Sequence, residues 1–534
     1  MPSEAVAWLV VVLSAHRLLL PGVSGVDRGQ FPPDFLFGTA SSAYQVEGGY
    51  LEGNKGLSNW DVFTHKQGTI EDGSNGDIAN DLYHRYMEDT ELMHSLGVNS
   101  YRFSISWARI LPRGRFGDVN QDGVAFYNAL IDSLLQRGIQ PFVTICHYDI
   151  PHELDERYGG WLSTEIQKDF GYFAEICFKM FGDRVKFWAT FNQPNLSIKF
   201  SYMDGWYAPG RCSKPFGNCT LGNSSIEPYI AGHNIIMSHA NAVSIYRKKY
   251  QGKQGGQIGI VMCAIWYEPF RNTTVDLLAV RRALSFGASW FLDPILLGDY
   301  PTEMREILGR NLPEFTSKQK KRLQATKLDF IGLNHYTTFY LKDCSFSPCE
   351  IDPLNGDARV ISLAQRDGVL IGETTGSPFF HDVPRGMEEM TMYYKERYNN
   401  TPTYITENAK RVRLTPKEAM RAVMRVMGPP MANDKDKRLA LVGSWERYNR
   451  VWPGLGADPL ELSDVWWGLK RMRSGDDKDR PLSSPQHPRG SSHSLEPVGP
   501  RPHTSSLAPL PPGPTSDPTS TVASAPVLPT PTAG

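Results

Sequence analysis

The sequence predicts an α/β fold: a (β/α)8 TIM barrel that lacks its normal eighth strand and is followed by a disordered C-terminal tail. First, short runs rich in Val, Ile and Phe alternate with helix-like stretches from residue 30 onward. Such alternation is typical of a parallel sheet with both faces covered by helices. Second, seven such units suit a barrel better than an open sheet. Third, the runs end in polar residues, which a barrel gathers around one pocket.

Seven runs have the composition of buried strands with polar tips. In chain order they are FLFGTASS, SYRFSISW, PFVTICHYD, FWATFNQ, IGIVMC, DFIGLNHY and TYITEN. Helix-like stretches separate them, for example residues 89–96, 124–137 and 164–181. We therefore assign residues 26–408 to an incomplete barrel of seven strands.

The repeating pattern stops after Asn408. Residues 409–475 contain Thr415-Pro416, which could begin a basic amphipathic helix, but they contain no further strand-like run with a polar tip. In residues 476–534, Pro, Ser, Thr and Gly dominate, and such a composition buries too little apolar surface to fold. We therefore predict an atypical segment at 409–475 and a Pro- and Ser-rich disordered tail at 476–534.

The N-terminal stretch AVAWLVVVLSAHRLLLPGVSG is an apolar run that ends in small residues. It resembles a secretory signal peptide, which we place at residues 1–25. An amphipathic N-terminal anchor is the alternative, because no Lys or Arg precedes the run and Arg17 interrupts it. No later stretch has the roughly 18 consecutive apolar residues of a membrane span. We expect the protein in the secretory pathway, with an extracellular or vacuolar destination.

Charge and motif spacing weigh against several kinds of partner. The net charge of −1 implies no strong field of either sign, so nucleic acid is a weak candidate. No Cys-x-x-Cys pair and no His cluster has metal-ligand spacing, so we expect no metal and no cofactor. The oligomeric state stays open at this stage.

The seven cysteines are compatible with secretion. Cys212 and Cys219 bracket the short loop CSKPFGNC and could close a small ring, as could Cys344 with Cys349. The cysteines that lie in apolar runs, and are expected to be buried thiols, are Cys146, Cys177 and Cys263. Sequons that could carry glycans occur at Asn218, Asn223, Asn272 and Asn399. Asn195 begins another sequon, but it lies at the expected site and should be unmodified.

Seven polar residues fall at the ends of the strand-like runs: Gln45, Arg102, His147, Asn192, Gln193, Tyr336 and Glu407. Any one of them could be a cap or a satisfied buried amide, but seven at equivalent ends indicate a pocket. The sequence motifs around these residues resemble those of glycoside hydrolase family 1, the plant-type β-glucosidases. These motifs are FLFGTASSAYQVEG, YRFSISWARILP, HYDIPHEL, GGWLS, TFNQPN, IGLNHYT and YITEN, and they occur in the same order along the chain as in the family.

The resemblance implies retaining hydrolysis of terminal non-reducing β-D-glucosyl residues, with two carboxyl groups about 5–5.5 Å apart. Glu407 of ITEN matches the nucleophile. Arg102 resembles the cation that keeps the nucleophile ionised, and Tyr336 would hydrogen-bond to it. The positions that hold the sugar hydroxyl groups are matched by Gln45, His147 and Asn192. The loop from Cys212 to Cys219 resembles a disulfide of the plant-type members.

Two departures from the family bear on activity. Position 193, where the family has its acid/base Glu, is Gln193, and an amide cannot give up a proton. The family's eighth strand carries a motif with a sugar-binding Trp and a Glu-Trp pair, and this motif is absent after Asn408. Ala409 also stands where the family has a Gly. A parallel barrel without its closing strand exposes two unpaired edges.

We therefore predict a β-glucosidase family protein of carbohydrate metabolism that is inactive or severely impaired as an enzyme. One alternative is a thioglucosidase or transglucosidase that uses activated glucosides, which need no proton. Against the thioglucosidase, Pro194 follows Gln193 as in the O-glucosidases, where that branch usually has Leu. Another alternative is a non-catalytic glucoside-binding protein. In each case the expected partner is a small-molecule β-glucoside with an aglycone that the sequence does not reveal.

Overall fold

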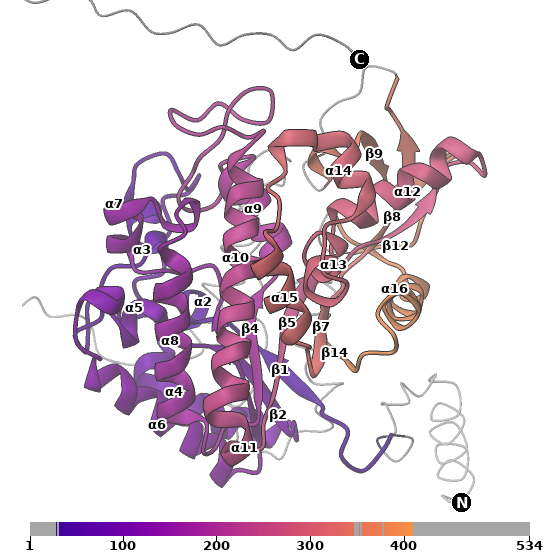
Figure 1. Cartoon of the computed structure of the whole chain (residues 1–534). Helices are drawn as coiled ribbons and strands as arrows, with labels where there is room; N and C mark the ends of the chain where they lie inside the picture. The colour runs from indigo at the N-terminus through magenta and orange to yellow at the C-terminus, as the bar shows by residue number, and fades with distance from the viewer. Residues whose placement is uncertain (1–27, 29–30, 347–351, 353–354, 376–378, 409–534) are drawn as a thin grey trace, which may run out of the picture. The chain divides into compact units, whose positions relative to one another are not determined.

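The computed structural model describes residue 28 and residues 31–346, 352, 355–375 and 379–408, all within the unit Met1–Ser474 (Figure 1). The predicted signal peptide at 1–25, the atypical segment at 409–475 and the tail at 476–534 lie outside the described residues. So does Cys349, the suggested partner of Cys344.

A parallel sheet of seven strands forms the centre of this unit. The strands are β1 (Gly38–Ala40), β2 (Ser100–Ser104), β3 (Gln140–Cys146), β4 (Phe187–Asn192), β5 (Gln257–Cys263), β7 (Phe330–Asn334) and β14 (Thr403–Glu407). They pair in chain order, each parallel to the next. The seven strands and the (β/α)8-type barrel predicted from the sequence are confirmed.

The residues of the central strands are buried because helices cover one face of the sheet and strand side chains fill the other. All five residues of β2 are buried, as are six of the seven residues of β5. Side chains from five different strands meet in one apolar cluster, which can happen only inside the curved sheet. This cluster consists of Phe142, Ala189, Val261 and Phe330, with Phe187 and Tyr404 packed against it.

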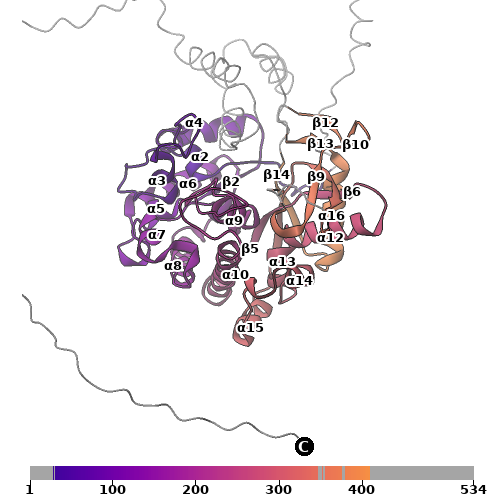
Figure 2. The same ribbon diagram turned by 90° about the horizontal axis from the view of Figure 1, so that it is seen from above.

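Helices lie around the strands when the unit is viewed from above (Figure 2). The α-helices are α2 (Ala43–Val46), α3 (Asn59–His65), α4 (Leu82–Ser95), α5 (Trp107–Ile110), α6 (Gln121–Gln136), α7 (His152–Tyr158), α8 (Ile166–Phe181), α9 (Pro194–Tyr202), α10 (Glu227–Ile245), α11 (Gln251–Gln254), α12 (Thr274–Phe286), α13 (Ser289–Leu296), α14 (Thr302–Leu308), α15 (Ser317–Ala325) and α16 (Pro384–Arg397). Single helical turns are η2 (Gly114–Phe116), η3 (Gly160–Leu162), η4 (Tyr246–Tyr250), η5 (Gly309–Asn311) and η6 (Gly356–Ala358).

Helix α6 illustrates why these stretches are helical. Asn120 caps it by accepting from the backbone N–H of Asp122, and Asp122 places a negative charge in the first turn. Its buried face repeats at helical spacing through Val124, Tyr127, Leu130, Ile131 and Leu134. The sequence prediction of 124–137 therefore found the buried face but missed the capped first turn.

Between the barrel strands, the chain also forms smaller sheets that the sequence analysis did not predict. A three-stranded sheet contains β6 (Trp266–Pro269), β8 (Thr338–Asp343) and β9 (Val360–Leu363). Two antiparallel pairs follow, β10 (Gln365–Arg366) with β11 (Val369–Leu370), and β12 (Glu373–Thr374) with β13 (His381–Asp382). Strand β8 begins four residues after β7 ends, so in the sequence its apolar residues follow the barrel strand almost directly.

The predicted bond between Cys212 and Cys219 is present, with an S–S distance of 2.05 Å. Three cysteines are buried free thiols, as expected: Cys146, Cys177 and Cys263. The sequon asparagines are exposed: Asn218, Asn223, Asn272 and Asn399. In the part of the chain that the structure describes, no helix is both long and apolar enough to cross a membrane.

Candidate active site

Glu407 ends strand β14, and each oxygen of its carboxylate has a partner. Arg102 of β2 donates from Nη1 to Glu407 Oε1 over 2.5 Å, and the hydroxyl of Tyr336 donates to Oε2. The two charged side chains are 5% and 22% exposed, and low exposure strengthens their attraction. Burial and the charge of Glu407 raise the pKa of Tyr336 well above its ordinary value. The phenol therefore keeps its proton and acts as a donor.

Arg102 is fixed by two further hydrogen bonds. Its Nε donates to Thr144 Oγ1 over 3.1 Å, and its Nη2 donates to Asn192 Oδ1 over 2.7 Å. Strands β2, β3, β4 and β14 thus meet at one guanidinium group. Because the planar group donates in fixed directions, it sets the position of Glu407 relative to Asn192.

Asn192 joins this cation to a histidine. Its Oδ1 also accepts from Asn334 Nδ2 over 3.0 Å, and its Nδ2 lies 2.9 Å from His147 Nε2. Burial and the positive charge of Arg102 lower the pKa of His147 well below its ordinary value, so the ring is neutral and Nε2 accepts. The proton then resides on Nδ1, which has no hydrogen-bond partner among the described residues. That N–H remains a donor for a ligand.

Gln193 lies between β4 and α9, in the left-handed region at φ 41° and ψ 50°. Its backbone N–H donates to Val261 O over 2.8 Å, and its side chain is buried. The amide Oε1 accepts from the hydroxyl of Tyr148 over 2.6 Å, and Nε2 donates to the hydroxyl of Tyr336 over 3.3 Å. The amide therefore bridges two phenols, one of which also contacts Glu407.

Gln45 lies on the short helix α2 and lines a pocket together with His147 and Tyr148. Its Oε1 accepts from the hydroxyl of Ser42 over 2.6 Å. The same pocket has aromatic and apolar walls formed by Tyr44, Trp60, Ile70 and Tyr207. Aromatic faces beside polar groups suit a ligand with both sugar hydroxyl groups and an apolar part.

The structure thus joins six of the seven predicted site residues through hydrogen bonds, and Gln45 joins them through the pocket wall that it shares with His147. Tyr148 and Asn334 are two site residues that the sequence motifs did not single out, although both lie within those motifs. Tyr148 directly follows His147, and Asn334 is the last residue of β7. Among the described residues, no group of three or more His, Cys, Asp or Glu side chains could hold a metal ion.

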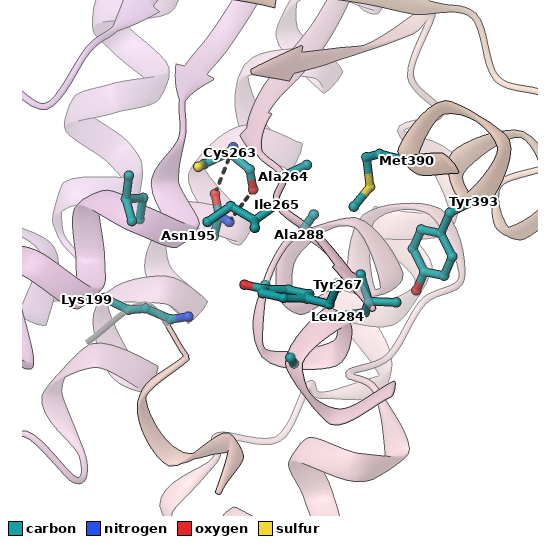
Figure 3. Close-up of a pocket in the computed structure, with 13 residues that line it drawn as sticks. Asn195, Lys199, Cys263, Ala264, Ile265, Tyr267, Leu284, Ala288, Met390 and Tyr393 are labelled. Atoms are coloured by element: carbon teal, nitrogen blue, oxygen red, sulfur yellow. Dashed lines mark hydrogen bonds between the residues drawn. The ribbon is translucent and has the colours of Figure 1, made fainter. Parts of the chain in front are cut away.

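A second pocket lies beyond the C-terminal end of β5 and contains none of the predicted site residues (Figure 3). In Figure 3, Lys199 and Tyr267 point into it from opposite walls. Burial lowers the pKa of Lys199 to about 8. Asn195 donates to Cys263 O over 2.8 Å and accepts from Cys263 N over 3.3 Å. The buried Asn195 amide is therefore hydrogen-bonded through both its nitrogen and its oxygen.

Comparisons with known proteins agree with this geometry. The family model described as glycosyl hydrolase family 1 matches residues 27–420. A rice protein named "Probable inactive beta-glucosidase 14" is 85% identical over 405 residues, 76% of this chain and 78% of that protein. Beta-glucosidase 47 of Arabidopsis thaliana is 56% identical over 396 residues, 73% of this chain and 72% of that protein.

Solved structures of β-glucosidases are also similar to this chain. One is a glutamate-to-glutamine mutant of rice Os3BGlu6 beta-glucosidase in a covalent complex with Glc from GA4GE. It matches with a TM-score of 0.70 and 45% identity over 75% of this chain and 86% of that chain. The family match covers more than half of the sequence, and the strand order and the site geometry fit it. The chain therefore belongs to glycosyl hydrolase family 1 and is a β-glucosidase family protein.

Proposed function

We propose that this chain binds a terminal β-D-glucosyl group and that Glu407 can attack its anomeric carbon, while hydrolysis of ordinary glucosides is severely impaired. The observation that carries the proposal is the pairing of Glu407 with Arg102 and Tyr336. These two donors fix the position of the carboxylate through both of its oxygens, and a nucleophile needs a fixed position relative to the carbon that it attacks. The substrate class is that of the family, small-molecule β-glucosides.

The placement of Gln193 supports the second half of the proposal. Its amide and the carboxylate of Glu407 both hydrogen-bond to the hydroxyl oxygen of Tyr336, so they lie within two hydrogen-bond lengths of each other. The separation of about 5–5.5 Å that retaining enzymes use fits within that limit. This placement supports the assignment of Gln193 to the general-acid position, where its amide would have no proton to release.

The loss of a general acid typically lowers the rate by about 10²–10⁴-fold, and most strongly for poor leaving groups. Two of the related proteins fit this expectation by their names alone. The rice relative is named "probable inactive", and the rice glutamate-to-glutamine mutant is described as a covalent complex with Glc. An impaired enzyme that forms a glycosyl-enzyme from activated donors is consistent with the name of the rice relative and with the covalent complex of the rice mutant.

Three groups are suited to hold the sugar hydroxyl groups. The Nδ1–H of His147 has no partner in the described part of the chain, and Gln45 lines the same pocket. Asn192 lies between His147 and Arg102, where a 2-hydroxyl group would interact most strongly in the transition state. We propose that the same contacts would serve a thioglucosidase, a transglucosidase or a glucoside-binding protein, so only turnover distinguishes these.

The absence of the family's eighth-strand motif from the sequence is the other proposed cause of impairment. In the described residues, β1 pairs only with β2 and β14 pairs only with β7. Glu407 is the last residue of β14, so the proposed nucleophile lies on an edge of the sheet. We also propose passage through the secretory pathway, which the exposed sequons and the disulfide support.

The first test is intact-mass spectrometry after incubation with a 2-deoxy-2-fluoro β-glucoside that carries a dinitrophenolate leaving group. This leaving group departs without a proton, so labelling requires only a formed pocket and an ionised Glu407. We expect one glycosyl adduct per chain, mapped to Glu407 by peptide analysis. A Glu407→Gln variant should not react, because its amide is a poor nucleophile.

Folded native protein that stays unlabelled would contradict the proposal. Binding of glucosides by such unreactive protein would then favour the non-catalytic sugar-binding alternative. A labelled protein that turns over only activated glucosides would support the impaired enzyme.

A further inference from the structure

The phenol of Tyr148 contacts the position from which a general acid would act. Its hydroxyl oxygen lies 2.6 Å from Gln193 Oε1 and donates to it, since an amide oxygen only accepts. Tyr148 is half-buried and lines the same pocket as Gln45 and His147, so its ring is part of the ligand-facing wall. The chain therefore places an O–H donor directly beside an amide that has no acidic proton.

The backbone holds this phenol in place at an energetic cost. Tyr148 has φ +77° and Gln193 has φ +41°, although both are non-glycine residues that disfavour the left-handed region. The Tyr148 ring also meets the His147 ring edge-on at 4.9 Å and lies 5.9 Å from the Tyr207 ring. A costly backbone conformation that persists at a ligand pocket indicates a functional constraint.

The orientation of the Gln193 amide explains where the phenol proton can go. Nε2 donates toward Tyr336 on the side of Glu407, so Oε1 faces Tyr148. A general acid must lie within hydrogen-bond reach of the leaving oxygen. A leaving oxygen within hydrogen-bond reach of the Gln193 amide would lie about one further hydrogen bond from the Tyr148 hydroxyl, which would then exchange Gln193 Oε1 for that oxygen as its acceptor.

We propose that Tyr148 is a further catalytic residue, and that its phenol donates the proton to the leaving oxygen in place of the missing carboxylic acid. The inference rests on the proposed function, because it needs Glu407 to act as the nucleophile. In the first step, a Glu407 oxygen bonds to the anomeric carbon, the bond to the leaving oxygen breaks, and that oxygen takes the Tyr148 proton. The products are a glycosyl-enzyme, a neutral alcohol and a phenolate.

The second step restores both residues. Water attacks the anomeric carbon, its proton passes to the Tyr148 phenolate, and the bond to Glu407 breaks to release the carboxylate. A phenol is a weaker acid than a carboxylic acid, so this route is slow for ordinary glucosides. It predicts residual activity that depends on Tyr148, and the dependence should grow as the leaving group becomes poorer.

The test compares native protein with Tyr148→Phe on two substrates, 2,4-dinitrophenyl and phenyl β-glucoside. The first needs no proton, and the second does. We expect Tyr148→Phe to lower kcat/KM for phenyl glucoside about 100-fold, at the lower end of what a general acid contributes, with the dinitrophenyl substrate changed less than about twofold. Fluoro-sugar labelling of Glu407 in the variant should be unchanged, which shows an intact pocket. Tyr172→Phe, on the exposed surface of α8, is the matched control.

Two further readouts separate a proton donor from a merely structural residue. Native turnover of phenyl glucoside should persist to high pH, whereas Gln193→Glu should lose activity near neutral pH, because a phenol holds its proton longer than a carboxylic acid. In the Gln193→Glu background, Tyr148→Phe should have less than about a fivefold effect, since a carboxylic acid now supplies the proton. The native pH profile needs no variant, so it tests the proposal even if Tyr148→Phe does not fold.

Equal losses on both substrates, or no loss on either, would overturn the role of Tyr148 while leaving labelled Glu407 as the nucleophile. A native activity that disappears near neutral pH would also overturn it. Failure of Glu407 to label in native protein is a different result, which would overturn the glucosidase assignment and the Tyr148 role together.

Discussion

At the residue scale, Gln193 occupies a position that a glutamic acid could fill with little rearrangement. Its Oε1 accepts from Tyr148, as a carboxyl oxygen would, and its Nε2 contacts the hydroxyl of Tyr336, which can both donate and accept. The Cα position is set by a backbone bond to Val261 that does not depend on the side chain. The defect is therefore one of proton chemistry and not of shape.

Restoring the acid should restore hydrolysis. Gln193→Glu is expected to raise kcat/KM for phenyl β-glucoside by about 100-fold or more, because the new carboxylic acid protonates the leaving oxygen. Initial rates by release of phenol measure the effect. The dinitrophenyl substrate should gain little in its first step, since that leaving group needs no proton.

Added azide provides the matched control for this prediction. A small anion can attack the glycosyl-enzyme without a general base, so azide should speed turnover of an activated glucoside in native protein and much less in the variant. If Gln193→Glu leaves every rate unchanged while Glu407 still labels, the substitution is not what limits the enzyme.

A site residue could be predicted from the sequence only where the sequence also indicates the direction of its side chain. The positions of Glu407 and Arg102 at the pocket were predictable because both lie at the ends of strand-like runs, where the pleat fixes which residues face the pocket, whereas the roles proposed for them came from the resemblance to the family. Tyr148 was not predictable as a site residue, because its direction depends on a left-handed backbone conformation that tyrosine does not signal. The hydrogen bond between Asn334 and Asn192 joins β7 to β4, and the sequence gives no information on such a pairing.

At the element scale, the connection from β3 to α7 buries a carboxyl group beside the pocket. Asp149 is 2% exposed, and its Oδ1 has no hydrogen-bond partner in the described part of the chain. Burial, and then the negative charge of Glu47, raise its pKa to about 7. Nearby Lys55 is already paired with Asp61 at 2.6 Å, so it compensates only in part.

This raised pKa predicts how stability depends on pH. Asp149 binds a proton more tightly in the folded state than in the unfolded state, where its pKa is near 4. The contribution of this proton binding to the free energy of unfolding is fully present below about pH 4 and is lost as pH rises through about 7. Asp149→Asn cannot titrate, so its Tm should fall less between pH 5 and pH 8 than the native Tm, by about 2–4 °C.

Scanning calorimetry at the two pH values measures this difference. Some native pH dependence should remain in the variant, because burial also raises the pKa values of Asp155 and Asp204 to about 7. Parallel Tm curves for native protein and variant would show that Asp149 does not titrate in this range. An Asp132→Asn variant, on the exposed side of α6, is the control for the chemical change.

The elements themselves were predictable to different degrees. The seven barrel strands have long apolar runs with polar tips, so their number and order could be predicted. The small sheet of β6, β8 and β9 could not, because its strands are short and their pairs lie between distant parts of the chain. Helix starts were displaced for a similar reason, since the first turn of α6 is stabilised by a polar cap and not by apolar periodicity.

At the scale of the whole molecule, the described barrel has two open edges. Strand β1 pairs only with β2, and β14 pairs only with β7, so both present backbone groups without a neighbouring strand among the described residues. Ile405 in β14 has 55% of its surface exposed, although this position would face a covering helix in a closed barrel. By contrast, the apolar cluster inside the curved sheet joins side chains of five strands, which helps to hold the described strands together.

Hydrogen exchange can test whether these edges are open in solution. Backbone amides that lack a partner exchange through small local openings, whereas amides in the middle of a sheet need larger ones. We expect peptides that cover β1 and β14 to exchange at least about 100-fold faster than peptides that cover β3 and β4, measured by mass spectrometry on the full chain. The slow central strands serve as the internal control within each sample. Equal protection at β14 and β4 would mean that another strand covers the edge, in which case Glu407 would lie in a closed barrel and Gln193 alone would limit activity.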